Sequence, residues 1–167
     1  MDARGSQIAV VGAGKPTDRV RRQAEELGRR LARGGAVVWT GGRGGVMEAA
    51  SRGARSEGGK TVGVLPGTSM RETPPNPWVE TAVFTGLGQA RNLVLVLSAD
   101  AVVAVGGAWG TLSEIALAKK HGRPVVLLDS WTLTPPEGAP GEGLEVAREA
   151  SEASRRALTL AREGRGG

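Results

Sequence analysis

Short apolar runs of strand length alternate with helical patterns along most of this chain. Such runs cover residues 8–11, 36–39, 61–65, 101–105 and 124–128, and residues 80–84 suggest one more. They are nearly continuous in apolar residues, which is typical of strands buried on both faces. Consecutive parallel strands need a crossover, and the intervening helical patterns supply it. The sequence therefore predicts an α/β fold: a doubly wound, Rossmann-like parallel sheet flanked by helices.

Apolar residues at helical spacing mark the segments between these runs. In residues 18–33, Val20, Ala24, Leu27 and Leu31 recur on one face, which predicts an amphipathic helix with that face buried. Further helices are expected over residues 46–56 and 110–120.

Residues 93–97 are ambiguous. Read locally, they form a strand that could pair with residues 101–105 as a hairpin. Alternatively, they belong to a buried helix over about residues 87–98. Parallel topology favours the helix, because a crossover must connect consecutive parallel strands.

The end of the chain is predicted to form a helix over about residues 144–163. The prediction rests on apolar residues at helical spacing, namely Val146, Ala150, Ala153, Ala157 and Leu160. We expect this helix to pack on the sheet or on a second subunit. Proline-rich loops are expected at residues 70–77 and 135–143, and fraying at residues 164–167. A length of 167 residues fits one domain that spans residues 1–167.

Composition excludes several classes of chemistry. The chain has no cysteine and a single histidine, His121, so disulfides, thiolate metal sites and histidine clusters are excluded. Acidic residues show no metal-ligand spacing, and no metal site is expected. Because no apolar run approaches the length of a membrane span and the N-terminus lacks the apolar core of a signal peptide, we expect a cytoplasmic protein with no membrane partner.

The net charge of +5 raises the question of nucleic-acid binding. Much of the positive charge lies on arginines of residues 18–33, and a basic stripe can be a nucleic-acid footprint. The chain, however, has one phenylalanine, no tyrosine and no recognisable nucleic-acid module. A solvated, arginine-rich helix face is the favoured interpretation, and a nucleic-acid partner is the less favoured alternative.

Three glycine-rich bends each follow a strand-like run. They are Gly12-Ala13-Gly14, Gly41-Gly42-Arg43-Gly44-Gly45 and Gly106-Gly107-Ala108-Trp109-Gly110. A bend of this kind that opens a helix presents bare backbone N–H groups at the positive end of the helix dipole, which is a site suited to phosphate. The three bends together predict a phosphorylated ligand.

Two common nucleotide-binding motifs are absent. Residues 12–17 lack the third glycine of G-x-G-x-x-G, and no acidic residue ends the second strand to hold a ribose. Gly59-Lys60-Thr61 imitates the end of a P-loop, but Ala54 stands where its first glycine is required. Neither NAD binding in the usual mode nor ATPase activity is expected.

The segment from Thr111 to Glu114 has two interpretations. As a capping box, Thr111 caps the helix and Glu114 bonds back to the cap N–H. As a ligand-binding segment, it lies at the carboxyl end of a strand, where ligands of open α/β sheets bind, and Glu114 could reach a bound sugar. This location supports the second interpretation. Arg91, at the start of an apolar segment, either lies in water at a helix end or faces the phosphate or Glu114.

These segments bear a resemblance to a known family. The run from Gly107 to Glu114 resembles the P-G-G-x-G-T-x-x-E signature of the LONELY GUY (LOG) proteins, long mislabelled lysine decarboxylases. The run from Gly41 to Met47 is similar to their G-G-G-x-x-G-x-M loop, and Arg91-Asn92 to their arginine-lysine pair. The resemblance covers about residues 7–131. The form that this signature takes around Trp109 is more similar to that of the branch that contains the molybdenum-cofactor carrier protein.

The glycine bends and this resemblance together imply a candidate site. Arg91 and Glu114 are the implied catalytic residues. The implied ligand-binding residues are Gly12, Gly14, Gly41, Gly42, Gly44, Gly45, Met47, Asn92, Gly107, Ala108, Trp109, Gly110 and Thr111.

The resemblance implies two alternative functions. LOG enzymes hydrolyse the N-glycosidic bond of nucleoside 5′-monophosphates, whereas the carrier proteins hold a phosphorylated pterin without turnover. Gly106 in place of the proline, Ala108 in place of a glycine and Asn92 in place of the lysine favour binding over catalysis. No cofactor is required; the bound ligand is expected to be AMP-like or of the molybdopterin type. The resemblance also implies a homodimer or larger homo-oligomer.

Overall fold

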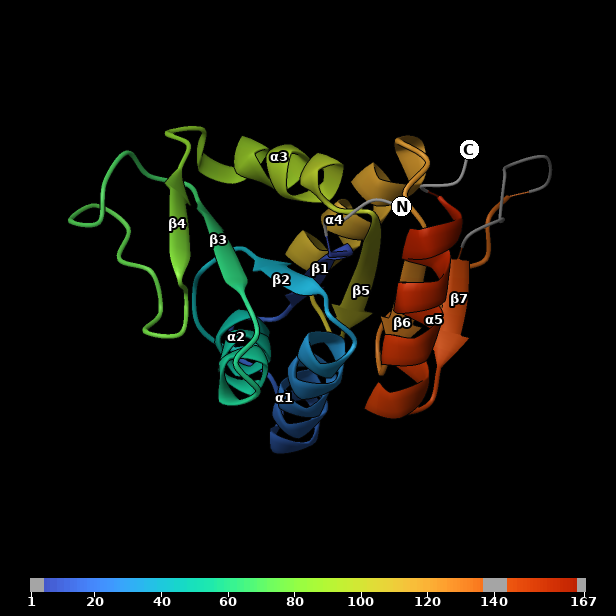
Figure 1. Cartoon of the computed structure of the whole chain (residues 1–167). Coiled ribbons are helices and arrows are strands. Elements are labelled where there is room, and N and C mark those ends of the chain that lie inside the picture. The colour runs from blue at the N-terminus through green and yellow to red at the C-terminus, as the bar shows by residue number, and fades with distance from the viewer. Residues whose placement is uncertain (1–4, 137–143, 165–167) are drawn as a thin grey trace.

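The computed structural model describes residues 5–136 and 144–164. Within them, seven strands form one parallel sheet in the order β4-β3-β2-β1-β5-β6-β7 (Figure 1). The strands are β1 (Gln7–Gly12), β2 (Val37–Thr40), β3 (Thr61–Leu65), β4 (Thr81–Phe84), β5 (Ala101–Val105), β6 (Val125–Leu128) and β7 (Leu144–Ala147). The helices are α1 (Asp18–Arg33), α2 (Val46–Ser56), α3 (Arg91–Ser98), α4 (Trp109–Lys120) and α5 (Ala150–Glu163), with a 3-10 turn, η1 (Gly88–Ala90), before α3. The predicted doubly wound α/β class is confirmed.

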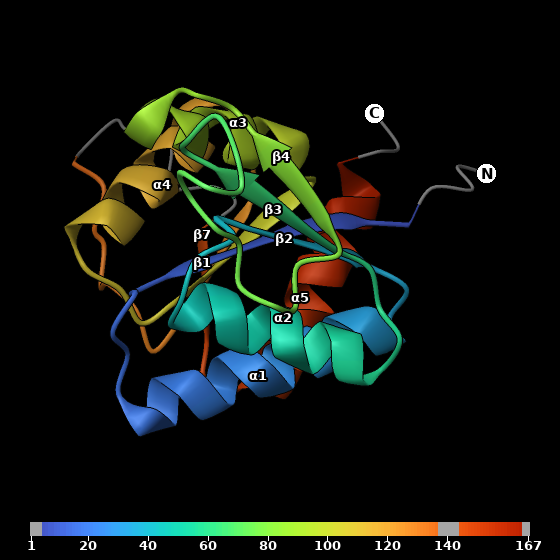
Figure 2. The same cartoon turned by 90° about the vertical axis from the view of Figure 1, so that its left-hand side faces the viewer.

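Helices cover both faces of the sheet, as Figures 1 and 2 show. Alternate residues of a strand point to opposite faces. Ile8 and Val10 of β1 accordingly pack with α1, α2 and α5, whereas Ala9 and Val11 pack with α3 and α4. This burial on both faces explains why the strands lack polar alternation in the sequence.

The helix prediction for residues 87–98 is confirmed in type, although its start is late. Residues 88–90 form η1, and the α-helix begins at Arg91. The hairpin alternative is wrong, because β5 pairs in parallel with β1 and β6.

The predicted start of the C-terminal helix is wrong. Leu144–Ala147 is strand β7, paired with β6, and α5 begins only at Ala150. Val146 shared the helical spacing of the later alanines, but its side chain is 67% exposed at the edge of the sheet. The loop predicted at residues 135–143 and the fraying at 164–167 lie mostly outside the described residues.

The centre of the sheet is a topological switch point. The chain proceeds from β1 through β2 and β3 toward one edge, and from β5 through β6 and β7 toward the other. The crevice that such a reversal leaves at the carboxyl ends of the two central strands is the usual ligand site of open α/β sheets. Two of the predicted glycine bends follow β1 and β5 there.

Candidate functional site

A cleft of about 370 Å³ opens at this switch point. Its wall is formed by Gly12, Ala13, Gly14, Met47, Pro66, Gly88, Gln89, Arg91, Asn92, Ala108, Gly110, Thr111 and Glu114. These residues lie at or just after the ends of β1 and β3, in η1, or at the starts and in the first two turns of α2, α3 and α4, so the cleft is built from strand ends and helix starts. Its size is within the range of small-molecule sites.

Nine of the predicted site residues meet in this wall. They are Gly12, Gly14, Met47, Arg91, Asn92, Ala108, Gly110, Thr111 and Glu114. They come from segments far apart in the sequence, which the parallel sheet brings to one edge.

Two further predicted residues lie directly behind the wall. Gly41 lies against the guanidinium group of Arg91 and the sulfur of Met47, so that a side chain at this position would collide with both. Gly45 lies against the carbonyl oxygens of Ala13 and Gly14. Both glycines allow the bend after β2 to approach cleft residues closely.

The remaining predicted residues lie outside the wall. They are Gly42, Gly44, Gly107 and Trp109. Gly42 packs near Leu65, Gly107 packs against Thr111, and Gly44 is exposed. The Trp109 side chain is 77% exposed and contacts Trp131 instead.

Sequence reasoning missed four wall residues, Ala13, Pro66, Gly88 and Gln89. Pro66 directly follows β3, and the rule that ligands bind beyond strand ends could have identified it. Gln89 lies in the 3-10 turn before α3, which the sequence did not separate from the helix.

Helix α4 presents a start without a side-chain cap to the cleft. Its first residue is Trp109, and the N-cap residue, Ala108, makes no side-chain capping hydrogen bond. The capping-box interpretation is therefore wrong: Thr111 is buried in the first turn, and Glu114 lines the cleft. The first N–H groups of a helix lack partners within it and carry the positive end of its dipole, so they can bind an anion.

The bend after β2 is fixed from a distant loop. The Asn76 side chain donates to the carbonyl oxygen of Arg43 at 2.8 Å, and its backbone N–H donates to that of Gly42 at 2.9 Å. The Val46 N–H donates to the carbonyl oxygen of Ala13 at 3.0 Å, which joins this bend to the one after β1.

Arg91 enters the cleft wall from the start of α3 with unused hydrogen-bonding capacity. Its Nε and Nη1 atoms are buried and have no hydrogen-bond partner among the described residues. Burial lowers the pKa of Arg91, the charge of Glu114 opposes that change, and the nearby positive charge of Arg43 adds to it. Buried guanidinium N–H groups without partners are unfavourable, so this group is suited to an anionic ligand.

Glu114 completes the charged part of the cleft from one turn inside α4. Burial raises its pKa from the ordinary value of 4.5 to about 7, and the positive charge of Arg91 opposes the rise. Its carboxyl group is therefore poised to exchange a proton near neutral pH. Two desolvated ionisable groups in one cleft are a typical feature of functional sites.

Fold and cleft together define a Rossmann-like α/β protein with its ligand site at the strand ends. The comparison with protein families agrees: the SLOG cluster4 family model matches residues 5–160, and the chain belongs to this family. The resemblance to LOG proteins inferred from the motifs is thereby confirmed.

Relatives of known sequence fall into two groups. An uncharacterized protein of Archaeoglobus fulgidus is 43% identical over 122 residues, which cover 73% of this chain and 79% of that protein. A cytokinin riboside 5′-monophosphate phosphoribohydrolase of Mycobacterium tuberculosis is 31% identical over 132 residues, covering 74% of this chain and 71% of the enzyme.

Solved structures of molybdenum-cofactor proteins are also similar. The molybdenum cofactor binding protein of Rippkaea orientalis is 37% identical with a TM-score of 0.86, and the match covers 95% of this chain and 99% of that one. The molybdenum cofactor carrier protein of Chlamydomonas reinhardtii is 36% identical with a TM-score of 0.82, and the match covers 94% and 98%.

Proposed function

We propose that the cleft binds a phosphorylated nucleotide or a nucleotide-like ligand. The observation that carries this proposal is the pair of buried, unpartnered guanidinium nitrogens of Arg91 in a wall otherwise rich in backbone. The phosphate lies at the uncapped start of α4, where Gly110 and Thr111 leave the amides accessible. Charge-assisted bonds from Arg91 to the ligand complete the hydrogen bonding that the protein alone leaves open.

With a nucleoside 5′-monophosphate in the cleft, we propose hydrolysis of the N-glycosidic bond. The bond from C1′ to the base breaks, its electron pair leaves with the base, which takes up a proton, and the sugar becomes oxocarbenium-like. The ionised carboxylate of Glu114 stabilises that positive charge and accepts a proton from the water that attacks C1′. The products are the free base and ribose 5-phosphate. The relatedness to phosphoribohydrolases supports this proposal.

Incubation with AMP and other nucleoside monophosphates, with free base measured by chromatography, tests the hydrolase. We expect base release that Glu114→Gln slows by about 10²- to 10³-fold. Absence of base release from any of the nucleotides by the native chain would remove the enzymatic proposal and leave the binding proposal standing.

A second candidate function is that of a non-catalytic carrier or sensor for a molybdenum-cofactor-type pterin. It is favoured by Asn92, which lines the cleft where LOG enzymes have a lysine, and by the likeness to the two molybdenum-cofactor proteins. The expected result is saturable binding of a phosphorylated pterin without turnover, detected as thermal stabilisation. Mass spectrometry of any small molecule that co-purifies with the chain distinguishes the two candidates directly.

We also propose self-association. Leu87 directly precedes η1 and is 51% exposed, and Leu97 lies in the last turn of α3 and is 42% exposed; two such leucines suit a contact with a second copy. Light scattering coupled to size-exclusion chromatography is expected to show a dimer or larger assembly, and a strictly monomeric chain would contradict this.

None of the described helices has both the length and the apolar character needed to cross a membrane.

A further inference from the structure

A second hollow lies on the other side of the bend that opens α4. Ala108 and Gly110 of this bend line the main cleft, whereas Gly106 and Gly107 line the hollow. The hollow measures about 270 Å³, and its other lining residues are Asp129, Ser130 and Trp131. A phosphate bound at the bend would therefore have a cavity on each side of it.

An unusual turn after β6 builds this hollow. Asp129 has a φ of 48°, a left-handed conformation that few residues other than glycine adopt. The side chain of Arg19 holds its carboxylate through two hydrogen bonds, at 3.0 and 3.1 Å. The turn directs the chain back toward the end of β5, and Trp131 thereby reaches the bend.

Two tryptophans meet beside the hollow. The ring centroids of Trp109 and Trp131 are 5.1 Å apart, and the rings are tilted by 44°. The indole N–H of Trp131 donates to the carbonyl oxygen of Ala108 at 3.3 Å, which orients its ring. Trp109 is nevertheless 77% exposed, so a large flat surface faces solvent next to the proposed phosphate position.

The hollow also contains a polar group with no partner. The hydroxyl of Ser130 is buried and makes no hydrogen bond among the described residues. Buried hydroxyls are nearly always paired, so an unpaired one on a residue that lines the hollow is a candidate partner for a ligand atom. Aromatic rings for stacking and an unpaired hydroxyl together suit a flat heteroaromatic ring of a phosphorylated ligand.

From these contacts we propose that Trp109 and Trp131 form a stacking platform for a second ring of the ligand. The site then takes a ligand of the dinucleotide class, with one ring in the main cleft, a diphosphate across the bend and the other ring on the platform. This inference rests on the proposed function, because it places the phosphate at the start of α4. It extends that function by naming a two-ring ligand.

Calorimetric titration with two defined probes tests the platform. AMP carries one ring, and diadenosine diphosphate carries two rings joined through a diphosphate. Because stacking of one base on an aromatic side chain strengthens binding by about tenfold or more, the native chain is expected to bind diadenosine diphosphate at least about tenfold more tightly than AMP. The ratio of the two dissociation constants is the quantity to compare among variants.

Trp109→Ala and Trp131→Ala are expected to bring that ratio close to one. Trp109 is the safer position, because its exposed side chain contributes little to the core; Trp131 is partly buried, so melting of its variant is followed in parallel. Trp78→Ala is the matched control. Trp78 is also exposed, but its carbonyl oxygen accepts a hydrogen bond from Thr61, the first residue of β3, at the end of that strand away from the cleft. The ratio of the two dissociation constants should therefore stay at the native value.

The outcomes separate the two proposals. If the native chain bound AMP and diadenosine diphosphate with similar dissociation constants, the platform would be overturned and the phosphate site would stay in place. Failure of both probes to bind would overturn the platform together with the proposed nucleotide binding and hydrolysis. If Trp109→Ala disrupted self-association but kept the native ratio, the tryptophan pair would belong to an interface between copies, and the platform would again be overturned.

Discussion

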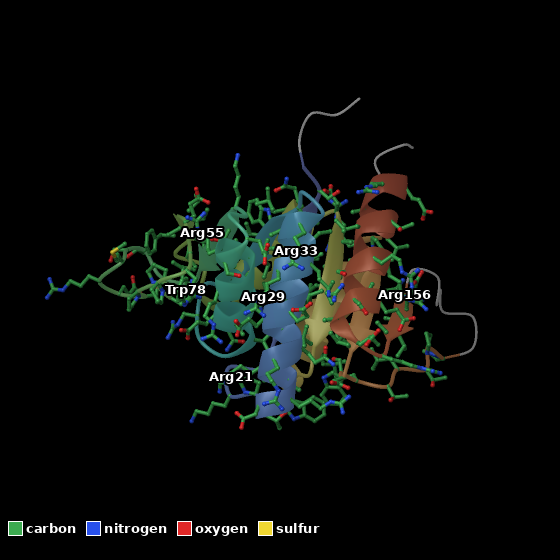
Figure 3. The ribbon with its side chains drawn as sticks, turned by 60° about the horizontal axis from the view of Figure 1, so that its bottom comes forward. Arg21, Arg29, Arg33, Arg55, Trp78 and Arg156 are labelled. Carbon is green, nitrogen blue, oxygen red and sulfur yellow. The ribbon has the colours of Figure 1, made fainter. Side chains whose placement is uncertain are left out.

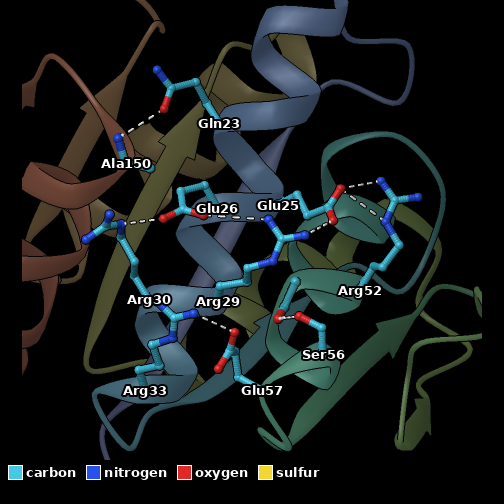
Figure 4. A network of polar contacts seen from close by, with 11 residues as sticks. Gln23, Glu25, Glu26, Arg29, Arg30, Arg33, Arg52, Ser56, Glu57 and Ala150 are labelled. Carbon is cyan, nitrogen blue, oxygen red and sulfur yellow. Dashed lines mark hydrogen bonds and ion pairs between the residues drawn. The ribbon is translucent and has the colours of Figure 1, made fainter.

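Arginine occurs in two opposite settings in this molecule. On the surface of α1 and α2, which Figure 3 views from below, arginines lie beside carboxylates of the same or the neighbouring helix. Figure 4 shows Arg30 bonded to Glu26 at 2.7 Å and Arg52 bonded to Glu25 at 2.5 Å. In the cleft, two buried guanidinium nitrogens of Arg91 donate no hydrogen bond to any described residue.

The difference distinguishes arginines that are paired with carboxylates of the protein from an arginine whose hydrogen-bond donors are available to a ligand. The surface arginines stabilise their own helices through i, i+4 pairs and bridge α1 to α2. Their pairing favours the solvated-face interpretation of the basic residues over nucleic-acid binding. In the cleft, by contrast, Arg91 leaves hydrogen-bonding capacity unused, and this predicts very different consequences for the same substitution in the two places.

The largest expected effect is on turnover. Arg91→Ala and Glu114→Gln should each lower kcat/KM for AMP hydrolysis by about 10²- to 10³-fold, because each removes electrostatic stabilisation from a desolvated site. Arg30→Ala removes the same charge from the surface and should leave the rate within about twofold of the native value. Steady-state kinetics of the three variants measure this. Equal losses from Arg30→Ala and Arg91→Ala would show that the surface and cleft arginines do not differ in function.

The pH dependence of turnover sharpens the comparison. Burial raises the pKa of Glu114 to about 7, and the proposed step needs its ionised form. Hydrolysis should therefore rise about tenfold per pH unit below pH 7 and level off above it. A kcat/KM profile from pH 5 to 9 measures the midpoint. A rate that falls as the pH rises through 7 would instead assign Glu114 the role of a proton donor.

A smaller effect is expected from crowding the cleft arginine. Gly41→Ala places a methyl group against the guanidinium of Arg91 and the sulfur of Met47, and so should displace Arg91 and weaken AMP binding by about tenfold. Gly164→Ala is the matched control, since it lies at the end of α5 where the added methyl group meets only an ordinary contact. Calorimetric titration compares the two, and similar affinities would show that the position of Arg91 is not limiting.

The smallest effect concerns stability. Because the folded-state pKa of Glu114 is raised, its ionisation destabilises the folded chain as the pH rises from about 4.5 to 7, and the whole penalty is present above that range. Glu114→Gln should therefore raise Tm by roughly 5 °C at pH 8 and leave it nearly unchanged at pH 4. The exposed Glu80, replaced by Gln, serves as the control in melting curves at both pH values. An inactive variant that is more stable than the native chain is the result that would identify a functional carboxylate.

The sequence predicted the elements that carry strong periodicity. The helix over residues 18–33 has the predicted bounds, since its buried face repeats clearly and the glycine pair at residues 34–35 ends it. Strand β7 was missed because Leu144–Ala147 has too few residues to distinguish a strand from the turn of a helix. The strand conformation of Leu144–Ala147 depends on its pairing with β6, which its own residues do not reveal.

Site prediction succeeded where strand ends or motifs mark a residue, and failed where a turn decides the contact. Arg91 and Glu114 could be placed together by resemblance, and both line one cleft. The contact between Trp109 and Trp131 depends on the left-handed turn at Asp129, which the neighbouring residues did not indicate. The capping box failed because its helix begins three residues earlier than the motif implies.

The position of the cleft between β1 and β5 has a consequence for how the molecule folds. Those strands meet across a separation of 93 residues, the span of the bond between Gln7 and Asp100, whereas the β1–β2 and β2–β3 pairs join strands that are closer along the chain. Closing so long a loop is slow, and the first half of the sheet can form before it. We therefore expect the ligand to engage only a late stage of folding, so that its presence retards unfolding far more than it accelerates refolding.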